Sequence, residues 1–428
     1  MDGLPAATDP PNKARYLVVS VDGHAGPTLK EDLRPYCPAR YLEDFDAFSA
    51  EVDRTLAAGE TNKELAVGLP FAFGGDEANI RSKTCPGLRD PIARRRDMDA
   101  DGIAADVIFA GGGNDQPLPF LGLGASAGPE NIAGDLRALG GQIWNEWLAD
   151  YISGAPDRHV GVMQVPIWDI NASIRMLERG RAAGLRAANF PASRPDFPAY
   201  NDPIYDPFWS ACEDLEISLM THTGGGAPGP GASGPGGFAI AISDGHVRTT
   251  SSLPQLIFGG VFERHSRLSV FYTELRVSWV PELLRNMDSI YFSDSTPPSH
   301  CELISRPPSD YWREHCFNGA SFLAPFEVAM RDEIGIRNLL WGADYPHTEG
   351  TWPRTLLSLR NTFADVPEEE SRLILGESAV EALRLDRVAL RSIADSIGPL
   401  PSEIGTPLAP EELPERPGLA FRRIGAFA

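Results

Sequence analysis

The stretch "HVGVMQVPIWDINASIRMLERGRAAGLRAANFPA", residues 159–192, contains the unit from which the fold is expected to be built. Residues 159–169 form an apolar, β-rich run, and Asp169 at its end can cap a following helix. Residues 170–184 carry apolar side chains on one helical face and end in glycine, which stops a helix. Residues 185–192 are β-rich again. A strand, a helix and another strand in this order predict parallel strands joined by a crossover helix.

The same alternation runs through most of the chain. Further β-rich runs are found at residues 16–24, 105–111, 217–224, 268–275, 315–322 and 338–344. Helical runs separate them, and Asp202-Pro203 is a typical start for one such helix. Parallel strands separated by helices imply an α/β protein, and eight such units imply a closed (β/α)8 barrel, not an open sheet.

Three regions exceed a minimal barrel. Residues 28–95 lie between the first two strands and are interpreted as a partly helical insertion at the mouth. The segment 224–237, "GGGAPGPGASGPGG", lacks the Gly-Lys-Ser/Thr ending of a phosphate loop and is predicted to be a mobile loop. The barrel, with this insertion, is expected over residues 1–385. Residues 386–428 are expected to form a C-terminal extension that packs over the barrel or a neighbouring subunit.

Composition narrows the classes of partner. The chain has 428 residues and a formal net charge of −21, which argues against nucleic acid and anionic membranes but not against a small anionic substrate. Its five cysteines form no CxxC pair, so neither a disulfide framework nor a cysteine zinc site is indicated. The sequence shows no signal-peptide pattern and no apolar run of roughly 18 residues. A cytoplasmic protein that forms a homo-oligomer and acts on a small molecule is expected.

Polar residues gather at the predicted carboxyl-terminal strand ends, where barrels of this kind carry their active sites. In chain order these residues are Asp22, His24, His222, Glu274, Asp344 and His347. Side chains alternate along a strand, so Asp22 and His24 are expected to face the same way. Two imidazoles and several carboxylates suit Zn²⁺, and also Mn²⁺ or Fe²⁺. One divalent metal is therefore expected, either to activate water or to polarise a substrate carboxylate or carbonyl.

Each of these residues also has a structural interpretation. A single histidine at a strand end is often a hydrogen-bonded structural residue, and Asp344 could cap the next helix. Three other histidines follow charged residues and are expected to be exposed: His159, His265 and His315. His246 and His300 are expected near the mouth without an assigned role. Trp168 and Trp279 are either packing residues or substrate platforms.

Several blocks in order, from "VVSVDGHAGP" through "DPIYDPFWSACEDLEISLMTHTGGG" and "LLWGADYPHTEGTWP" to "ESAVEALRLD", resemble a known family. It is the amidohydrolase-related family of metal-dependent barrels that includes aminocarboxymuconate-semialdehyde decarboxylase and the aromatic-acid decarboxylases. The resemblance implies a distorted TIM barrel with one divalent metal, usually zinc and sometimes manganese or iron. It places His24, His222 and Asp344 on the family's metal ligands.

Two departures from the family pattern bear on the reaction. The first strand commonly carries His-x-His or Glu-x-His, where this chain has Asp22, a less secure fourth ligand. In the decarboxylases the sixth strand typically ends in His-Gly-Gly, with an acid/base histidine, where this chain has Glu274-Leu275-Arg276. The second departure favours a hydrolase that uses metal-activated water on an amide, imide or carbonyl. Asp344 would then bind the metal and accept the water's proton, and Glu274 would assist proton delivery.

The alternative reaction is non-oxidative decarboxylation of a small aromatic or unsaturated acid, with the metal binding the substrate carboxylate. A barrel that only binds a ligand or partner is a third reading. The expected substrate-binding residues are Arg276, His347 and Trp168, although Arg276 could instead lie on a helix surface.

Overall fold

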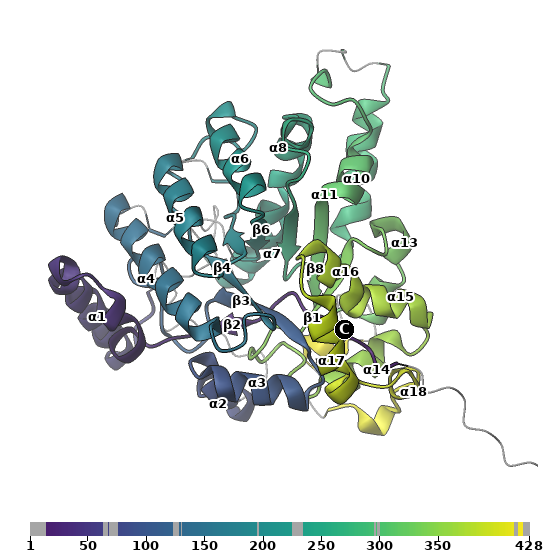
Figure 1. Ribbon diagram of the computed structural model, residues 1–428, viewed down its shortest axis with the longest axis horizontal. Helices are drawn as coiled ribbons and strands as arrows, with labels where there is room; N and C mark the ends of the chain where they lie inside the picture. The colour runs from purple at the N-terminus through teal and green to yellow at the C-terminus, as the bar shows by residue number, and fades with distance from the viewer. Residues whose placement is uncertain are drawn as a thin grey trace, which may run out of the picture.

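A parallel barrel forms the centre of the molecule (Figure 1). The computed structural model describes residues 14–62, 67, 76–122, 128–129, 131–194, 197–224, 234–294, 297, 300–414 and 418–422. The strands are β1 (Val19–Ser20), β2 (His24–Ala25), β3 (Ala105–Ala110), β4 (His159–Met163), β5 (Ala187–Asn189), β6 (Ser218–His222), β7 (Val270–Thr273), β8 (Cys316–Ser321) and β9 (Leu339–Gly342). They pair in the order β1-β3-β4-β5-β6-β7-β8-β9, all parallel, and β2 continues along β3.

The first predicted strand closes the barrel. This strand is divided into β1 and β2. The residues between β1 and β2 form backbone hydrogen bonds with β9 and with the turn that follows β9. The N–H of Val21 donates to the carbonyl oxygen of Trp341 (3.0 Å), and Gly23 forms a parallel bridge with Tyr345. The eight strand positions expected from the sequence and the TIM-barrel fold class are confirmed.

Helices surround these strands. They are α1 (Leu42–Ala57), α2 (Asp76–Lys83), α3 (Pro91–Ala100), α4 (Gly134–Ile152), α5 (Ile170–Ala182), α6 (Asp206–Asp214), α7 (Gly237–Thr250), α8 (Ser252–Phe258), α9 (Val261–Arg264), α10 (Trp279–Tyr291), α11 (Pro308–His315), α12 (Pro325–Val328), α13 (Arg331–Ile334), α14 (Thr355–Phe363), α15 (Glu368–Arg372), α16 (Ser378–Ala382), α17 (Arg387–Ile397) and α18 (Pro401–Ile404). Short 3₁₀ or π turns add η1 (Leu29–Leu33), η2 (Arg34–Tyr36), η3 (Ala39–Tyr41), η4 (Pro86–Leu88), η5 (Pro203–Tyr205), η7 (Leu373–Glu377), η8 (Pro410–Glu412) and η9 (Leu419–Phe421).

The apolar core has two main layers. The larger one lies between the strands and the surrounding helices, where Trp144 and Trp209 are fully buried. The second fills the barrel itself with side chains from most strands, such as Val107 and Met220, and includes Leu390 and Ala394 of α17. The helix α17 therefore closes one end of the barrel, and the functional side chains gather at the other, carboxyl-terminal end.

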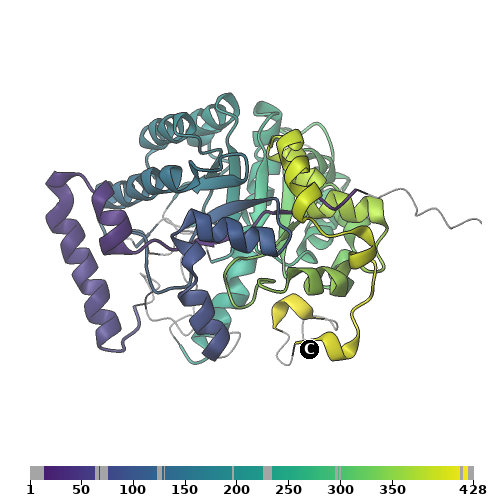
Figure 2. The same cartoon turned by 60° about the horizontal axis from the view of Figure 1, so that its bottom comes forward.

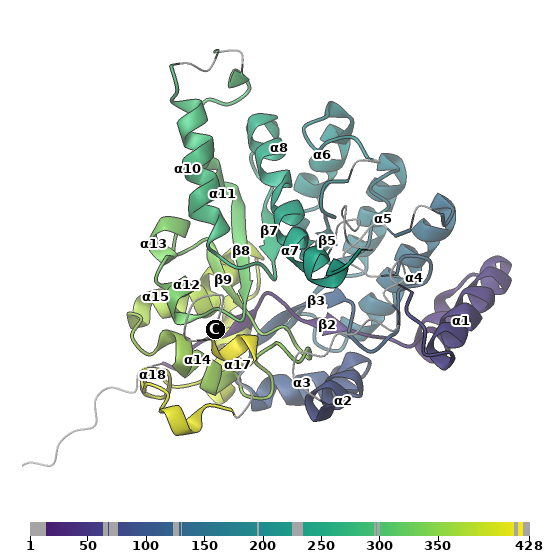
Figure 3. The same cartoon turned by 180° about the vertical axis from the view of Figure 1, so that it is seen from behind.

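The insertion and the extension both carry helices. Residues 28–95 contain α1, α2 and part of α3, so the insertion is partly helical as expected. In two views α1 lies at the outer edge of the molecule, away from the strands (Figures 2 and 3). Most of the glycine-rich loop, residues 225–233, lies outside the described residues. No described helix is both long and apolar enough to cross a membrane.

Three histidines that were expected to be exposed are buried, so that prediction was wrong. Nδ1 of His159 lies 2.7 Å from a carboxylate oxygen of Asp106, and Nδ1 of His265 lies 3.1 Å from one of Glu213. His315 donates from Nδ1 to the carbonyl oxygen of Leu268 (3.0 Å). A charged neighbour in sequence does not keep a histidine in water when a partner from another element satisfies the ring.

Candidate active site

The carboxylates at two strand ends sit on unusual backbone. Glu274 follows β7 directly, and Asp344 lies just beyond β9; their φ angles are +55° and +54°. This left-handed region costs non-glycine residues about 1–3 kcal/mol, and such residues cluster at functional sites. Asp344 does not cap a helix, because the next helix, α14, begins only at Thr355. The capping interpretation of Asp344 is therefore wrong.

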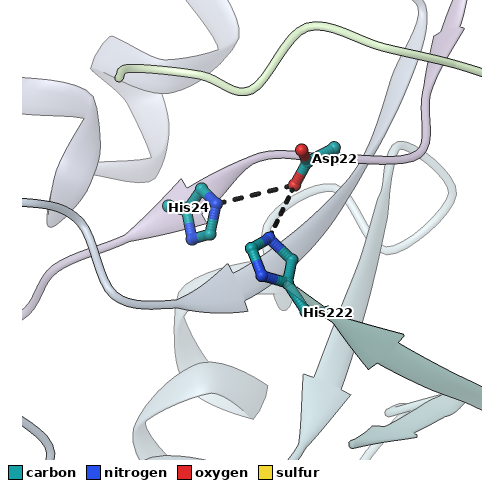
Figure 4. Close-up of side chains that lie close together, drawn as sticks. All are labelled: Asp22, His24 and His222. Atoms are coloured by element: carbon teal, nitrogen blue, oxygen red, sulfur yellow. Dashed lines mark ion pairs between the residues drawn. The ribbon is translucent and has the colours of Figure 1, made fainter. Parts of the chain in front are cut away.

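Asp22, His24 and His222 converge on one point from the first and fifth strand positions (Figure 4). Oδ1 of Asp22 lies 3.5 Å from Nε2 of His24 and 3.4 Å from Nε2 of His222. All three residues are at least 95% buried. Asp22 and His24 face the same way, as alternation along the strand predicts.

Backbone carbonyl groups fix the orientation of both imidazole rings. His24 donates from Nδ1 to the carbonyl oxygen of Ala110 (3.0 Å), and His222 donates from Nδ1 to that of Thr223 (2.8 Å). With a proton held on Nδ1, each ring turns its Nε2 atom towards Asp22. Metal-binding histidines commonly show this arrangement.

Asp344 joins the cluster from just beyond the end of β9, the eighth strand position. Its Oδ1 lies 3.3 Å from Nε2 of His24 and 2.8 Å from Nδ1 of His347. His347 also donates from Nε2 to the carbonyl oxygen of Gly111 (2.9 Å), so both its ring nitrogens have neighbours. Its ring stacks on that of His24, with 4.2 Å between the ring centroids.

Asp344 and His347 form an ion pair. Burial would lower the pKa of His347, but the charge of Asp344 and the hydrogen bond to it raise that pKa to about 10. Burial would likewise raise the pKa of Asp344, but His347 and His24 outweigh burial and lower it. Burial and the charge of His347 also lower the pKa of His24, which keeps that imidazole neutral.

Glu274 adds a carboxyl group beside His222, with 3.2 Å between Oε2 and Nε2. Burial, followed by the charges of Asp344 and Asp22, raises its pKa well above the usual value. Glu349 contributes a third carboxylate next to Glu274 and Asp344, and burial followed by the charge of Asp344 raises its pKa as well. Glu349 was not predicted from the sequence, although it lies only two residues after His347.

The buried atoms of the cluster fit a divalent metal. Each of four residues offers a buried atom with no hydrogen-bond partner within the described residues: Asp22 Oδ1, His24 Nε2, His222 Nε2 and Asp344 Oδ2. Buried polar atoms are normally satisfied, so an orphaned set of two nitrogens and two oxygens that face one another indicates a ligand shell. The other oxygen of Asp22 accepts a hydrogen bond from Ser321, which orients the carboxylate.

Arg94 supports this shell from the insertion and was not identified from the sequence. It is fully buried and donates from Nη1 to the carbonyl oxygen of His24 (2.6 Å) and from Nε to Asp106 (2.7 Å). A Cβ on Gly23 would lie 2.8 Å from Nη2 of Arg94, which accounts for a glycine between Asp22 and His24. The hydrogen bond from Arg94 to His24 joins α3 to the first strand, and no local sequence pattern predicts it.

The remaining candidates lie outside the cluster of Asp22, His24, His222 and Asp344. Arg276 is half-buried in the segment between β7 and α10, so the helix-surface interpretation is wrong. Trp168 lines a small cavity near the ends of β4 and β5, and the guanidinium of Arg137 lies 4.2 Å from its ring. Trp279 packs against Tyr272 and donates from Nε1 to Asn318 (2.9 Å), as a packing residue does.

The chain is similar in sequence to γ-resorcylate decarboxylase. With that enzyme from Rhizobium sp. (strain MTP-10005) it shares 24% identity over 221 residues, which cover 47% of this chain and 64% of the relative. The chain thus spans less than two thirds of the relative's length.

Solved decarboxylase structures share the fold. The 5-carboxyvanillate decarboxylase of Sphingomonas paucimobilis matches with a TM-score of 0.61 and 19% identity, over 86% of this chain and 99% of that one. A second 5-carboxyvanillate decarboxylase structure, from Novosphingobium aromaticivorans with bound manganese, matches with a TM-score of 0.60 and 18% identity. The match covers 86% of this chain and 97% of that one.

A family model described as Amidohydrolase matches residues 112–385, more than half of the chain. This range contains His222, Glu274 and Asp344, and the barrel brings them to Asp22 and His24, which precede it. The chain therefore belongs to the amidohydrolase family.

Proposed function

We propose that the protein is a metal-dependent, non-oxidative decarboxylase of a small aromatic or unsaturated acid. The observation that carries this proposal is the buried cluster of unsatisfied ligand atoms on Asp22, His24, His222 and Asp344. The similarity to γ-resorcylate decarboxylase supports this choice among the reactions that such a cluster can catalyse.

These four residues would hold one divalent metal. The mixed nitrogen and oxygen set favours zinc, with manganese and iron as alternatives. When bound, the metal would supply a Lewis-acid charge that attracts and polarises the substrate carboxylate. The carbonyl groups of Ala110 and Thr223 hold the two imidazoles in the orientation that this binding needs.

Glu274 is the proposed proton donor. In the reaction the bond between the substrate carbon and its carboxylate breaks, carbon dioxide leaves, and the electron pair stays on the carbon. A proton from Glu274 then forms the new C–H bond, and solvent restores the carboxyl group. The 3.2 Å distance between Oε2 of Glu274 and Nε2 of His222 supports this assignment, because a proton donor must lie close to the bound substrate.

The other residues have binding and positioning roles in this proposal. His347 positions Asp344 through their ion pair, and its ring, which stacks on that of His24, contacts the substrate. Trp168 offers an aromatic wall at the ends of β4 and β5. Arg276 binds an anionic part of the substrate.

The test is a screen of metal-loaded protein against hydroxybenzoic and other aromatic acids in deuterated water. Release of carbon dioxide, with one deuterium incorporated at the carbon that lost it, is the expected result. Complete absence of carbon dioxide release across zinc-, manganese- and iron-loaded samples would refute the proposal.

Hydrolysis is the second candidate, because the matching family model is described as Amidohydrolase and because Glu274 stands where the decarboxylases typically carry histidine. A hydrolase would attack an amide, imide or carbonyl with water, Asp344 accepting the proton. Incubation of the same samples with amides and imides in ¹⁸O-labelled water separates the reactions. Labelled product without carbon dioxide would replace the decarboxylase proposal with this one.

A further inference from the structure

The C-terminal extension reaches the end of a barrel strand through one buried arginine. Arg422 follows η9 and donates from Nη2 to the carbonyl oxygen of Phe322 (3.0 Å), the residue directly after β8. The same nitrogen donates to Glu327 of α12 (2.8 Å), and the side chains of this ion pair are 4% and 2% exposed. The turn η9 packs against α14, where Ser358 donates to the carbonyl oxygen of Ala420 (2.9 Å). The extension is therefore fastened at the point where β8 ends.

The turn of residues 322–324 needs this support because its backbone is strained. The φ angle of Phe322 is +52°, a left-handed conformation that is unfavourable for a bulky side chain. Such a residue keeps this conformation only where its surroundings hold it. Arg422 binds the carbonyl oxygen of Phe322 directly. It also holds Glu327, which in turn accepts a hydrogen bond from the N–H of Ala324 (3.0 Å). One side chain of the extension thus stabilises the turn at two places.

The residue before this turn contacts the proposed metal site. Ser321 is the last residue of β8, and its Oγ donates a hydrogen bond to Oδ2 of Asp22. The other oxygen of Asp22, Oδ1, faces Nε2 of His24 (3.5 Å) and Nε2 of His222 (3.4 Å). A Cβ on Gly342 would lie 2.8 Å from both Ser321 Oγ and Asp22 Cβ, so the approach of the two residues leaves no room for a side chain there. The direction of the Asp22 carboxylate therefore depends on the position of the Ser321 hydroxyl.

We propose that Arg422 is a positioning residue for the metal site. Arg422 holds the turn of residues 322–324, this turn fixes the end of β8, and Ser321 at that end orients the carboxylate of Asp22. The inference rests on the metal site of the proposed function. It adds that the C-terminal extension raises the affinity of the barrel for its metal. Groups that hydrogen-bond a metal ligand typically change metal affinity by about 10–100-fold, so the effect is large enough to measure.

The affinity of the full chain for Zn²⁺ tests this role without substrate, by competition with a chelator that changes colour when it binds zinc. Ser321→Ala should weaken zinc binding by about 10–100-fold, and Arg422→Gln by about tenfold. Arg422→Gln leaves Glu327 buried without its partner and can fail to fold. A variant with both Arg422→Met and Glu327→Gln is therefore measured beside it, because neutral replacements for a buried ion pair often preserve stability. The same loss of zinc affinity is expected.

A double-mutant cycle shows whether Arg422 acts through Ser321. In Ser321→Ala protein, the further loss of Arg422 should change zinc affinity by less than about twofold, because the contact that it positions is already absent. The visible spectrum of Co²⁺-loaded protein reports the geometry of the ligands and should shift in the Arg422 and Ser321 variants. Glu412→Gln is the matched control. Glu412 pairs with Arg360 of α14 (2.7 Å) and fastens the same extension, so this change should leave zinc affinity and the cobalt spectrum unaltered.

The outcomes separate this inference from the proposed function. Unchanged zinc affinity in folded Arg422 variants, or an equal loss with and without Ser321, would overturn the positioning role. An equal loss in Glu412→Gln, or failure of both Arg422 variants to fold, would make Arg422 a general structural anchor and overturn it as well. A wild type that binds no zinc, manganese or iron would refute the metal site itself. The expected affinities without any release of carbon dioxide would support the positioning role and reject only the decarboxylase proposal.

Discussion

The backbone N–H of Asp344 donates a hydrogen bond to the carbonyl oxygen of Asp22, with 3.1 Å between the two atoms. The bond joins the strand position that opens the barrel to the one that completes it. It also brings two carboxylates, which would repel each other, into a single buried cluster with His24. Such a cluster is stable only with compensating positive charge, and a divalent metal bound there would supply it.

Removing either imidazole should remove the metal. His24→Ala and His222→Ala each delete one nitrogen from the orphaned set, so neither variant is expected to retain stoichiometric metal after dialysis. His300→Ala is the control, because His300 is exposed. Metal analysis of the three proteins by mass spectrometry decides the point. Full metal content in both site variants would contradict the assignment.

Asp344→Asn should fold normally and lose turnover by about 10²–10⁴-fold, because asparagine keeps the shape but not the charge that binds metal and orients His347. Asp344→Ala should also lose metal. A true helix cap provides the contrast: Asp169 accepts from the N–H of Ala172 (2.9 Å), and Asp169→Ala should cost about 0.5–2 kcal/mol of stability with activity intact. Substantial turnover in metal-loaded Asp344→Asn would exclude this role.

Glu274→Gln should keep the metal and lose turnover by about 10²–10⁴-fold, since the amide cannot supply the proton for the new C–H bond. Glu282→Gln, at a side chain that is 82% exposed on α10, controls for loss of a surface charge. Rates of carbon dioxide release are compared at equal metal content. Wild-type rates in Glu274→Gln would assign proton transfer to another group.

Stability should depend on pH through Asp101. Burial raises the pKa of this carboxyl to about 6, although Thr355 donates to it (2.7 Å). The folded pKa exceeds the unfolded one, so the folded state binds more protons between about pH 4 and 6, and stability falls as pH rises through that window. Asp101→Asn removes this loss and should stabilise the protein by about 1–3 kcal/mol at pH 7 but not at pH 4. Urea unfolding of the wild type and Asp101→Asn at pH 7 and pH 4 measures this change in stability. An equal stability difference between the two proteins at both pH values would contradict the prediction.

Arg94→Leu should destabilise the protein by about 3–5 kcal/mol, because Asp106 would remain buried without its main partner. The matched control is Arg267→Leu, whose pair with Asp214 is exposed and should contribute about 1 kcal/mol or less. Denaturant unfolding of both variants gives the comparison. A small loss of stability in Arg94→Leu would mean that other partners of Asp106, such as His159, are enough to stabilise its buried carboxylate.

Local pattern was enough to predict the barrel and the gathering of most residues of the buried polar cluster. Strand and helix periodicity are properties of neighbouring residues, so runs such as residues 159–192 predicted the alternation that the structure confirms. Parallel strands present their carboxyl ends at one rim of the barrel. This rule predicted that His24, His222 and Asp344 lie close together. The alternation of side chains placed Asp22 beside His24.

Only the tertiary structure decided which charged groups meet across the chain. Arg94 contacts the carbonyl of His24, and Arg422 pairs with Glu327, through packing between elements that no local period links. The buried histidines were mispredicted for the same reason: the exposure of His159 depends on Asp106, which lies on a different strand. The sequence by itself determined where strands, helices and candidate ligands lie along the chain. Burial and charge pairing were decided by contacts between distant residues, because desolvation and Coulomb energies depend on distance in space and not on separation in sequence.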